Sequence, residues 1–473
     1  MPVLQLIRNP SKSAIAAVLV LLSLAELLYL YFGLAIAGVV SSFAFCGIIL
    51  VSSSIASLRE WCLAGICVLL VVLAFLVGLP GETIFGALER AAFFAAFIYL
   101  VTLLKEAAER SPSVLEIGRY LTSQPERRRY YATAFGGHLF GVLLNFGAIS
   151  LLAPLVQRGA RAGVPPGEEG ERRARQLEQR QLSALIRGFC WVIIWTPTAL
   201  TQAVILSEMP EADPATVIML GLVASLVMIL IGRVEDRFAW RALPPGGQIS
   251  AGPFPGLAFR RLMAVCLFLI GPTVAIVMLS DLSTATAMML MAPIVFIGWT
   301  LVLTPAGSGP GERLSTAQSQ LAVLLTQSAP GLAKSAFSLG ASGFIGIMAA
   351  ALAPVDQIAA SMNLDGMPAW LFLAALPILI TLGGQLALSP IMVVVFLASV
   401  ILELEFVAAS QTMIAFALGA GWALSMTASP NATATLLISG VSGIPPTTLT
   451  WRWNGRYALL CYAAFCVFFA VLA

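Results

Sequence analysis

Residues 132–157 read ATAFGGHLFGVLLNFGAISLLAPLVQ, an apolar and glycine-rich stretch that holds His138, the only histidine of the chain. Basic residues flank it on both sides: Arg127, Arg128 and Arg129 before it, and Arg158, Arg161, Arg172, Arg173 and Arg175 after it. Because Lys and Arg collect on the cytoplasmic side of membrane proteins, both ends of the stretch are expected on that side. The stretch is therefore predicted to be a re-entrant hairpin, which is typical of transporters and channels.

The composition places the rest of the chain in the membrane as well. Of 473 residues, 59% are hydrophobic and only 10% are charged, which is too little charged surface to cover a water-soluble core. The formal charge of +3 is small, and the basic loops also carry acids, so no nucleic-acid function is predicted. The seven cysteines form no CxxC pair and are interpreted as buried thiols. The expected fold is an all-α polytopic membrane protein.

Hydropathy and charge divide the chain into about eleven spans and two hairpins, since a helix needs about 20 apolar residues to cross a bilayer core. The predicted spans are residues 14–32, 34–56, 61–79, 84–104, 185–207, 215–231, 262–279, 283–303, 333–352, 412–439 and 458–473. Residues 105–131 are predicted to form an amphipathic helix on the cytoplasmic surface. The basic loops then predict a protein of the inner (cytoplasmic) membrane, with the N-terminus inside and the C-terminus outside.

A second hairpin is predicted over residues 370–402. This apolar run is too long for one crossing and too short for two, and the acidic residues Asp365 and Glu403 flank it. Acidic flanks without basic residues place both of its ends on the outer side, opposite to the first hairpin. Its residues 383–386, Gly-Gly-Gln-Leu, resemble Gly-Gly-His-Leu at residues 136–139.

Each hairpin is followed by a span that contains a proline among hydroxyl and amide side chains, Thr-Pro-Thr at residues 196–198 and Ser-Pro-Asn at residues 429–431. Because the two hairpins enter from opposite faces, the chain is predicted to be an inverted repeat. The first half is 1–243, with the hairpin 132–157 and the broken span 185–207. A cytoplasmic linker at 244–261 leads to the second half, 262–473, with the hairpin 370–402 and the broken span 412–439.

The hairpin turns and broken spans are the predicted binding site. Non-helical backbone in lipid exposes amide and carbonyl groups at a cost of several kcal/mol each, so it is expected to line a polar cavity. Free helix N-termini can hold an anion, and carbonyls and hydroxyls can hold sodium. The residues expected at the substrate are Asn145, Gly147, Thr196, Thr198, Ser389, Asn431 and Thr433. Those expected at the coupling ion are Asn145, Thr201, Ser389, Ser429 and Thr435.

His138 is the candidate proton relay, and the alternative is a packed or hydrogen-bonded histidine. Glu26, Glu89 and Arg90 are either functional charges within the membrane or charges near span ends that snorkel. No cofactor is expected. Na⁺ and H⁺ are the two candidate coupling ions, and no other metal is predicted.

In each half, a hairpin, a loop and a span broken by Pro, Ser and Thr follow one another. This order resembles the ion transporter superfamily, and most of all its divalent anion sodium symporter branch of dicarboxylate, citrate and sulfate carriers. Those symporters carry Ser-Asn-Thr at both turns, where this chain has Leu-Asn-Phe-Gly at Asn145 and Leu-Ser-Pro at Ser389. The resemblance implies a homodimer whose hairpin-bearing transport domain moves against a scaffold. It also implies roles for these two turn residues and for Thr198 and Asn431.

The sequence thus predicts a secondary active transporter and not an enzyme. The expected substrate of this ion-coupled carrier is a small organic or inorganic anion, with a carboxylate as first choice. One alternative is a membrane-embedded enzyme of cell-envelope glycan or lipid metabolism, which would need a large external loop with bases and carboxylates. The outer loops here are short and nearly devoid of bases. The other alternative is a channel, but an inverted repeat favours alternating access over a continuous pore.

Overall fold

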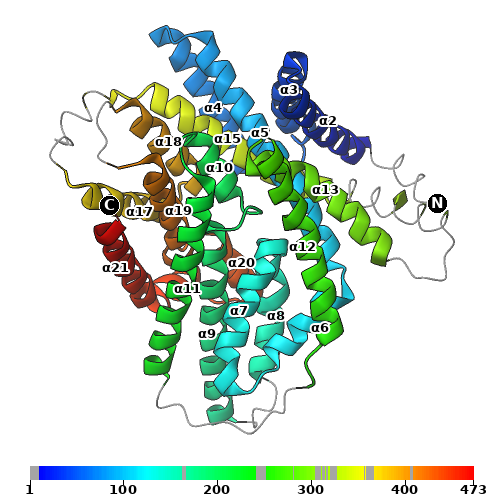
Figure 1. The fold of residues 1–473 in the computed structure, drawn as a ribbon, viewed down its shortest axis with the longest axis vertical. Helices are drawn as coiled ribbons and strands as arrows, with labels where there is room; N and C mark the ends of the chain where they lie inside the picture. The colour runs from blue at the N-terminus through cyan, green and yellow to red at the C-terminus, as the bar shows by residue number, and fades with distance from the viewer. Residues whose placement is uncertain are drawn as a thin grey trace. The chain divides into compact units, whose positions relative to one another are not determined.

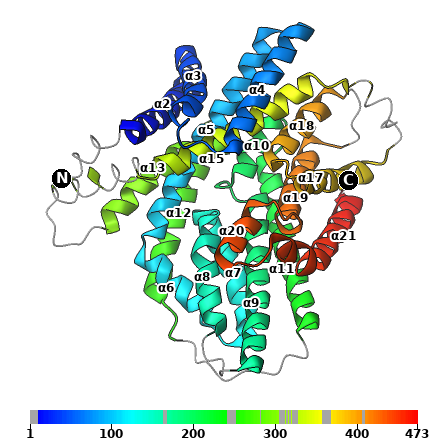
Figure 2. The same ribbon diagram turned by 180° about the vertical axis from the view of Figure 1, so that it is seen from behind.

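The computed structural model describes residues 10–161, 167–240, 252–280, 282–303, 311, 315, 318–319, 327–355, 357, 367–404 and 409–472. Within these ranges every regular element is a helix, and no strand is present (Figures 1 and 2). The predicted all-α polytopic membrane fold is confirmed. Of the predicted linker 244–261, residues 244–251 lie outside the described residues, and so does Asp365.

The chain divides into two compact units, and each unit takes segments from both predicted halves. Unit 1 comprises Met1–Ala107, Val265–Met362 and Ile391–Glu405. Its helices are α2 (Pro10–Phe32), α3 (Ala35–Val51), α4 (Leu58–Val77), most of α5 (Gly81–Glu109), most of α12 (Gly256–Leu279), α13 (Thr284–Leu303), α15 (Ala329–Ala351) and α18 (Pro390–Glu403).

Unit 2 comprises Ala108–Ala264, Asn363–Pro390 and Phe406–Ala473. Its helices are α6 (Pro112–Thr122), α7 (Glu126–Leu144), α8 (Gly147–Arg161), α9 (Glu168–Phe189), η1 (Cys190–Ile194), α10 (Leu200–Glu208), α11 (Pro214–Ala239), α17 (Ala369–Gln385), α19 (Gln411–Ala428), α20 (Thr433–Ser442), η3 (Thr448–Arg452) and α21 (Gly455–Leu472).

Unit 1 is held together by close packing of α15 against α2, α3 and α4. Phe45 of α3 stacks on Phe337 of α15, with ring centroids 5.7 Å apart. The Gly340 position has no room for a side chain, because an added Cβ would lie 2.7 Å from the carbonyl oxygen of Ala91. The buried carboxyl of Glu26 also lies in this unit, near Ser41, Glu89 and Arg90.

Unit 2 places α7 and α9 in direct backbone contact. A Cβ at Gly188 of α9 would collide with the carbonyl oxygen of Ala134 on α7, and one at Gly137 would lie 2.9 Å from the carbonyl oxygen of Leu185. Small residues at such positions let two helices approach more closely than larger side chains allow. Gly137 is therefore a packing glycine, which fixes the first hairpin against α9.

Nine described segments are long and apolar enough to cross a membrane, two fewer than the eleven predicted spans. They are Lys12–Phe32, Leu58–Val77, Gly81–Glu106, Pro214–Ala239, Gly256–Leu279, Thr284–Val302, Ala329–Ala351, Gln411–Ser442 and Gly455–Leu472. The predicted span 34–56 forms α3, which has only 17 residues, and the predicted span 185–207 is interrupted between η1 and α10. Both fall short because a continuous helix of about 20 residues is needed.

The predicted surface helix over residues 105–131 is three separate pieces. Its first residues continue α5 to Glu109, its middle is α6, and its end begins α7. Val114 and Ile117 of α6 are buried in unit 2, where α6 packs on α7 and α8. The apolar face that predicted contact with lipid is thus covered by protein.

The two predicted hairpins differ in their packing. In the first, α7 and α8 lie side by side, joined at Asn145 and Phe146 (Figures 1 and 2). In the second, a short turn joins α17 to α18. Here α17 packs on α19 and α21 within unit 2, whereas α18 belongs to unit 1. Entry of either segment into the membrane from one face stays a prediction.

Candidate functional site

Two strained turns mark the ends of α7 and α17. Among the described residues, Asn145 (φ 49°) and Ala387 (φ 63°) are the two non-glycine residues with positive φ. This backbone region is sparsely populated by L-residues, and such strain tends to be kept at binding sites. Each of these residues lies in the turn of a predicted hairpin.

The break between η1 and α10 is tied to the first turn. The hydroxyl of Thr198 donates a hydrogen bond to the carbonyl oxygen of Val142 at 2.6 Å, and it lies 2.9 Å from the hydroxyl of Thr196. Both threonines are buried. Since Val142 lies three residues before Asn145, these bonds hold the end of α7 against the broken segment.

The break between α19 and α20 makes the same kind of contact with α17. Ser429 donates from its hydroxyl to the carbonyl oxygen of Gly384 at 2.7 Å. Asn431 donates from its side-chain amide to the carbonyl oxygens of Gly384 and Gln385, both at 3.1 Å. Gly384 lies three residues before Ala387, as Val142 lies three residues before Asn145. The two halves therefore join each break to the equivalent carbonyl of its turn.

Three buried side-chain oxygens in this region have no hydrogen-bond partner among the described residues: Oδ1 of Asn145, Oε1 of Gln202 and Oγ1 of Thr435. An unsatisfied buried polar atom costs about 1–3 kcal/mol, so each one calls for an explanation, such as a bound ligand or ion. Gln202 and Thr435 stand at equivalent positions, each five residues after the proline of its break. These two oxygens therefore stand at matching positions in the two broken segments.

Both oxygens lie in the first turn of a short helix whose N-terminus lacks a side-chain cap. Ala199 precedes α10 and Ala432 precedes α20, and neither can supply a capping oxygen. The first amide groups of a helix have no partner within the helix and carry the positive end of its dipole. Within unit 2, α19 packs on η1 and α10, while α20 packs on α8 and α9. The amide donors and oxygen acceptors of both breaks therefore belong to the same unit.

The other predicted site residues differ in how deeply the structure buries them. Gly147 is buried at the start of α8, and Thr201 is buried in the first turn of α10. Thr433 is exposed at the start of α20, and Ser389 is half-buried in the second turn. Among the described residues, no hydrogen bond joins Ser389 or Thr433 to the rest of the site. Gln202 was missed by sequence reasoning, although its distance from Pro197 was a usable signal.

His138 is a fully hydrogen-bonded neutral ring in this arrangement. Its Nε2 accepts from the indole N–H of Trp195 at 3.1 Å, so its Nδ1 carries the proton and donates to the carbonyl oxygen of Gly188 at 3.0 Å. The ring also stacks on Trp195, with centroids 5.6 Å apart. A second proton on Nε2 would face the indole N–H donor. These contacts favour the packed, hydrogen-bonded histidine over the relay.

The Gly-Gly-X-Leu segments occupy different positions relative to the two turns. His138 lies seven residues before Asn145, in the middle of α7, whereas Gln385 lies two residues before Ala387, at the end of α17. The hydrogen bonds instead align Val142 with Gly384. The sequence likeness between the two segments therefore does not give the structural register of the repeat.

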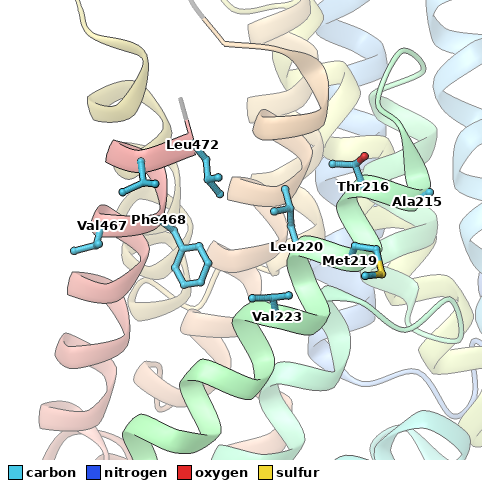
Figure 3. A pocket seen from close by; sticks show the side chains of 9 residues that line it. Ala215, Thr216, Met219, Leu220, Val223, Val467, Phe468 and Leu472 are labelled. Carbon is cyan, nitrogen blue, oxygen red and sulfur yellow. The ribbon is translucent and has the colours of Figure 1, made fainter.

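A separate cavity of about 590 Å³ lies between α11 and α21 (Figure 3). Its lining is apolar apart from Thr216 and includes Met219 and Leu220 of α11 and Phe468 and Leu472 of α21. None of its lining residues belongs to the broken segments or the turns. The cavity offers no group that would recognise an ion, and we do not include it in the site.

Comparison with known proteins gives a fold likeness only. No family model and no curated protein sequence matches the chain. Among solved structures, the crystal structure of the YdaH transporter of Alcanivorax borkumensis, described as having an unusual topology, matches with a TM-score of 0.55. The sequences are 14% identical, and the match covers 87% of this chain and 98% of that one. At this identity the match shows a shared fold, and membership of the divalent anion sodium symporter branch stays a prediction.

Proposed function

We propose that this chain is a secondary active transporter that carries a small organic or inorganic anion and is driven by a sodium gradient. A carboxylate is the first choice of substrate. The observation that carries the proposal is the matched pair of broken segments. Each one leaves a buried oxygen without a hydrogen-bond partner among the described residues, at Gln202 and Thr435, and each one ends at an uncapped helix N-terminus. A pair of equivalent sites built from an inverted repeat suits alternating access.

The chemistry of these groups suits a cation together with an anion. Neutral amide and hydroxyl oxygens, with the carbonyls of unwound backbone, are the ligands that hold Na⁺ in such transporters. Uncapped amides at the starts of α10 and α20 suit the carboxylate or oxyanion of a substrate. Proton coupling through His138 has less support, because both ring nitrogens already have partners. Sodium is therefore the coupling ion that we propose first.

The two compact units support a moving-domain mechanism. Unit 2 holds both turns and both broken segments, while unit 1 holds most of the early helices of each half. We propose that unit 2 is the transport domain and unit 1 the scaffold, in a homodimer with the N-terminus in the cytoplasm. The solved structure that shares the fold is described as a transporter, which agrees with a transport function in general.

Uptake into proteoliposomes tests the function. Purified protein would be given labelled succinate, citrate or sulfate, each with an inward sodium gradient, an inward proton gradient or no gradient. We expect accumulation of one carboxylate with the sodium gradient alone. Accumulation with the proton gradient alone would replace sodium by H⁺. Equal uptake in all three conditions would contradict coupled transport.

A thermal-shift screen tests the ligand class beforehand. A ligand that binds only the folded protein stabilises it by RT ln(1 + [L]/Kd), so the stabilisation grows with the ligand concentration relative to its Kd. We expect a carboxylate to raise the unfolding temperature more in NaCl than in an equal concentration of choline chloride. If neither the carboxylates nor sulfate raises it in either salt, the anion assignment is wrong.

A further inference from the structure

The indole of Trp422 is a buried hydrogen-bond donor that has no acceptor among the described residues. The side chain lies in α19 and is 4% exposed, and its Nε1 is unpaired. Two other indoles of unit 2 do find acceptors: Trp191 donates to the hydroxyl of Tyr457 and Trp195 donates to His138. Because an unpaired buried donor is unfavourable, the N–H of Trp422 calls for an explanation.

The helices α10 and α19 pack on each other within unit 2 and run in opposite directions. Glu211, which follows α10, and Gln411, at the start of α19, are joined by hydrogen bonds of 3.0 and 3.2 Å. Further along, a Cβ at Gly419 would lie 3.6 Å from Cδ1 of Ile205. A step towards the C-terminus of α19 is therefore a step towards the N-terminus of α10.

Trp422 lies level with the first turn of α10. It stands three residues after Gly419, and Gln202 stands three residues before Ile205. Three residues are about 4.5 Å of helix, and residues three apart share a helix face. Trp422 is thus on the side of α19 that meets α10, and Gln202 is on the side of α10 that meets α19. An unpaired donor and the unpaired Oε1 of Gln202 face the same region, and no hydrogen bond joins them.

The first turn of α10 adds further donors to this region. Among the described residues, no hydrogen bond to a backbone carbonyl begins at the amides of Leu200 or Thr201, and Ala199 supplies no cap. These amides also carry the positive end of the helix dipole. The segment 195–205 contains no Lys or Arg. An anion at this place would therefore be held by neutral N–H donors.

We propose that the indole N–H of Trp422 binds the substrate by donating to an oxygen of its carboxylate or oxyanion group. An indole N–H only donates, so it suits an anionic oxygen and does not suit a cation. The inference rests on the proposed function and adds to it a residue that recognises the charged group of the substrate.

Gln202 has the opposite polarity, which suits the coupling ion. Its amide nitrogen donates to the carbonyl oxygen of Ile194 at 2.6 Å, so its Oε1 is the atom left for a ligand. A neutral amide oxygen is a suitable ligand for Na⁺. An anionic oxygen held by Trp422 would help to neutralise that Na⁺, so each ligand would favour the binding of the other. Loss of the indole donor should therefore weaken the anion while the ligands of Na⁺ stay in place.

The test uses full-length protein in detergent, with Trp422 replaced by β-(3-benzothienyl)alanine. This analogue keeps the bicyclic shape and has sulfur in place of the N–H, and Trp422→Phe is the second variant. The control carries the same analogue at Trp191, which is fully buried and donates to Tyr457 at 2.6 Å. Calorimetric titration measures the Kd of succinate, citrate and sulfate in NaCl. Thermal unfolding without these anions compares NaCl with choline chloride.

We expect both Trp422 variants to bind the anion about tenfold more weakly or worse, because a hydrogen bond to a charged group is worth at least that factor. The extra stability in NaCl over choline chloride should be unchanged. The Trp191 control should unfold at a lower temperature, because it loses a hydrogen bond, and should keep the wild-type Kd.

Three outcomes would overturn the inference: an unchanged Kd in the Trp422 variants, an equal rise of the Kd in the Trp191 control, or joint loss of the anion and Na⁺ effects, which indicates a packing role. Absence of binding of all three anions to the wild type would instead refute the proposed function, and this inference with it.

Discussion

Replacing Thr435 by valine should stabilise the protein and stop transport. The side chain is fully buried in α20, and its hydroxyl has no hydrogen-bond partner among the described residues. Valine has nearly the same shape, so the change opens no cavity, and the two residues have similar helix propensities. The remaining effect is the removal of an unsatisfied buried hydroxyl, which costs about 1–3 kcal/mol. The free energy of unfolding should therefore rise by about that amount.

The stability change is large enough to measure. For a cooperative unit of about 150–250 residues, 1 kcal/mol shifts the unfolding temperature by about 2–4 °C, so we expect a rise of at least 2 °C in the absence of ligand. Thr198→Val should act in the opposite direction, because its hydroxyl donates to the carbonyl oxygen of Val142. That loss leaves a carbonyl without its partner and should lower the unfolding temperature.

Transport separates the site from simple packing. We expect sodium-driven uptake by the Thr435→Val protein to fall at least tenfold, since an oxygen proposed to bind the ion is gone. Thr427→Val is the matched control: Thr427 is also fully buried, but its hydroxyl donates to the carbonyl oxygen of Leu424 at 2.8 Å. Uptake by the control should be unchanged. Destabilisation by Thr435→Val, or uptake equal to that of the wild type, would refute the reasoning.

Three further outcomes are expected. Arg187→Leu should lower the free energy of unfolding by about 3–5 kcal/mol, because it removes a buried arginine and leaves the half-buried carboxylate of Glu235, 2.6 Å away, without its ion pair. Arg175→Leu, which breaks an exposed pair, should cost less than about 1 kcal/mol in the same denaturation assay. Gly188→Ala should abolish monodisperse protein in size-exclusion chromatography, because its Cβ would collide with a carbonyl oxygen of α7. His138→Gln should keep the pH profile of uptake, and a lost pH dependence would restore the proton relay.

The all-α fold could be read from the sequence because hydropathy and segment length decide whether a helix can lie in a bilayer. The predicted breaks at Pro197 and Pro430 coincide with gaps between helices, since proline removes an amide donor and obstructs the preceding turn. The number of spans was harder to predict. The helix α3 and the interrupted segment after α9 have the composition of a membrane span, but neither forms a continuous helix that is long enough. The two compact units are each built from segments that alternate along the chain, and no local feature of the sequence indicates where one unit gives way to the other.

Side-chain roles within the site depended on burial, which a sequence does not display. Thr198 and Asn431 were predicted to bind substrate because they follow a proline. In the structure, their donors are engaged by carbonyls at the ends of α7 and α17. Gln202 was not predicted, because a glutamine near a threonine-rich break looks like any other polar residue. Its position five residues after Pro197, which matches that of Thr435 after Pro430, was the one signal for it in the sequence.

The two halves meet the same physical requirement with different residues. A helix that ends inside a packed unit leaves carbonyls that need donors. In the first half one threonine hydroxyl supplies the donor to Val142, and in the second half a serine hydroxyl and an asparagine amide supply it to Gly384. Since each donor belongs to a broken segment, a shift of that segment would release the neighbouring turn. Ligand binding at Gln202 or Thr435, a few residues further along the same segments, could therefore move the turns directly, which gives the proposed transporter a physical link between occupancy and gating.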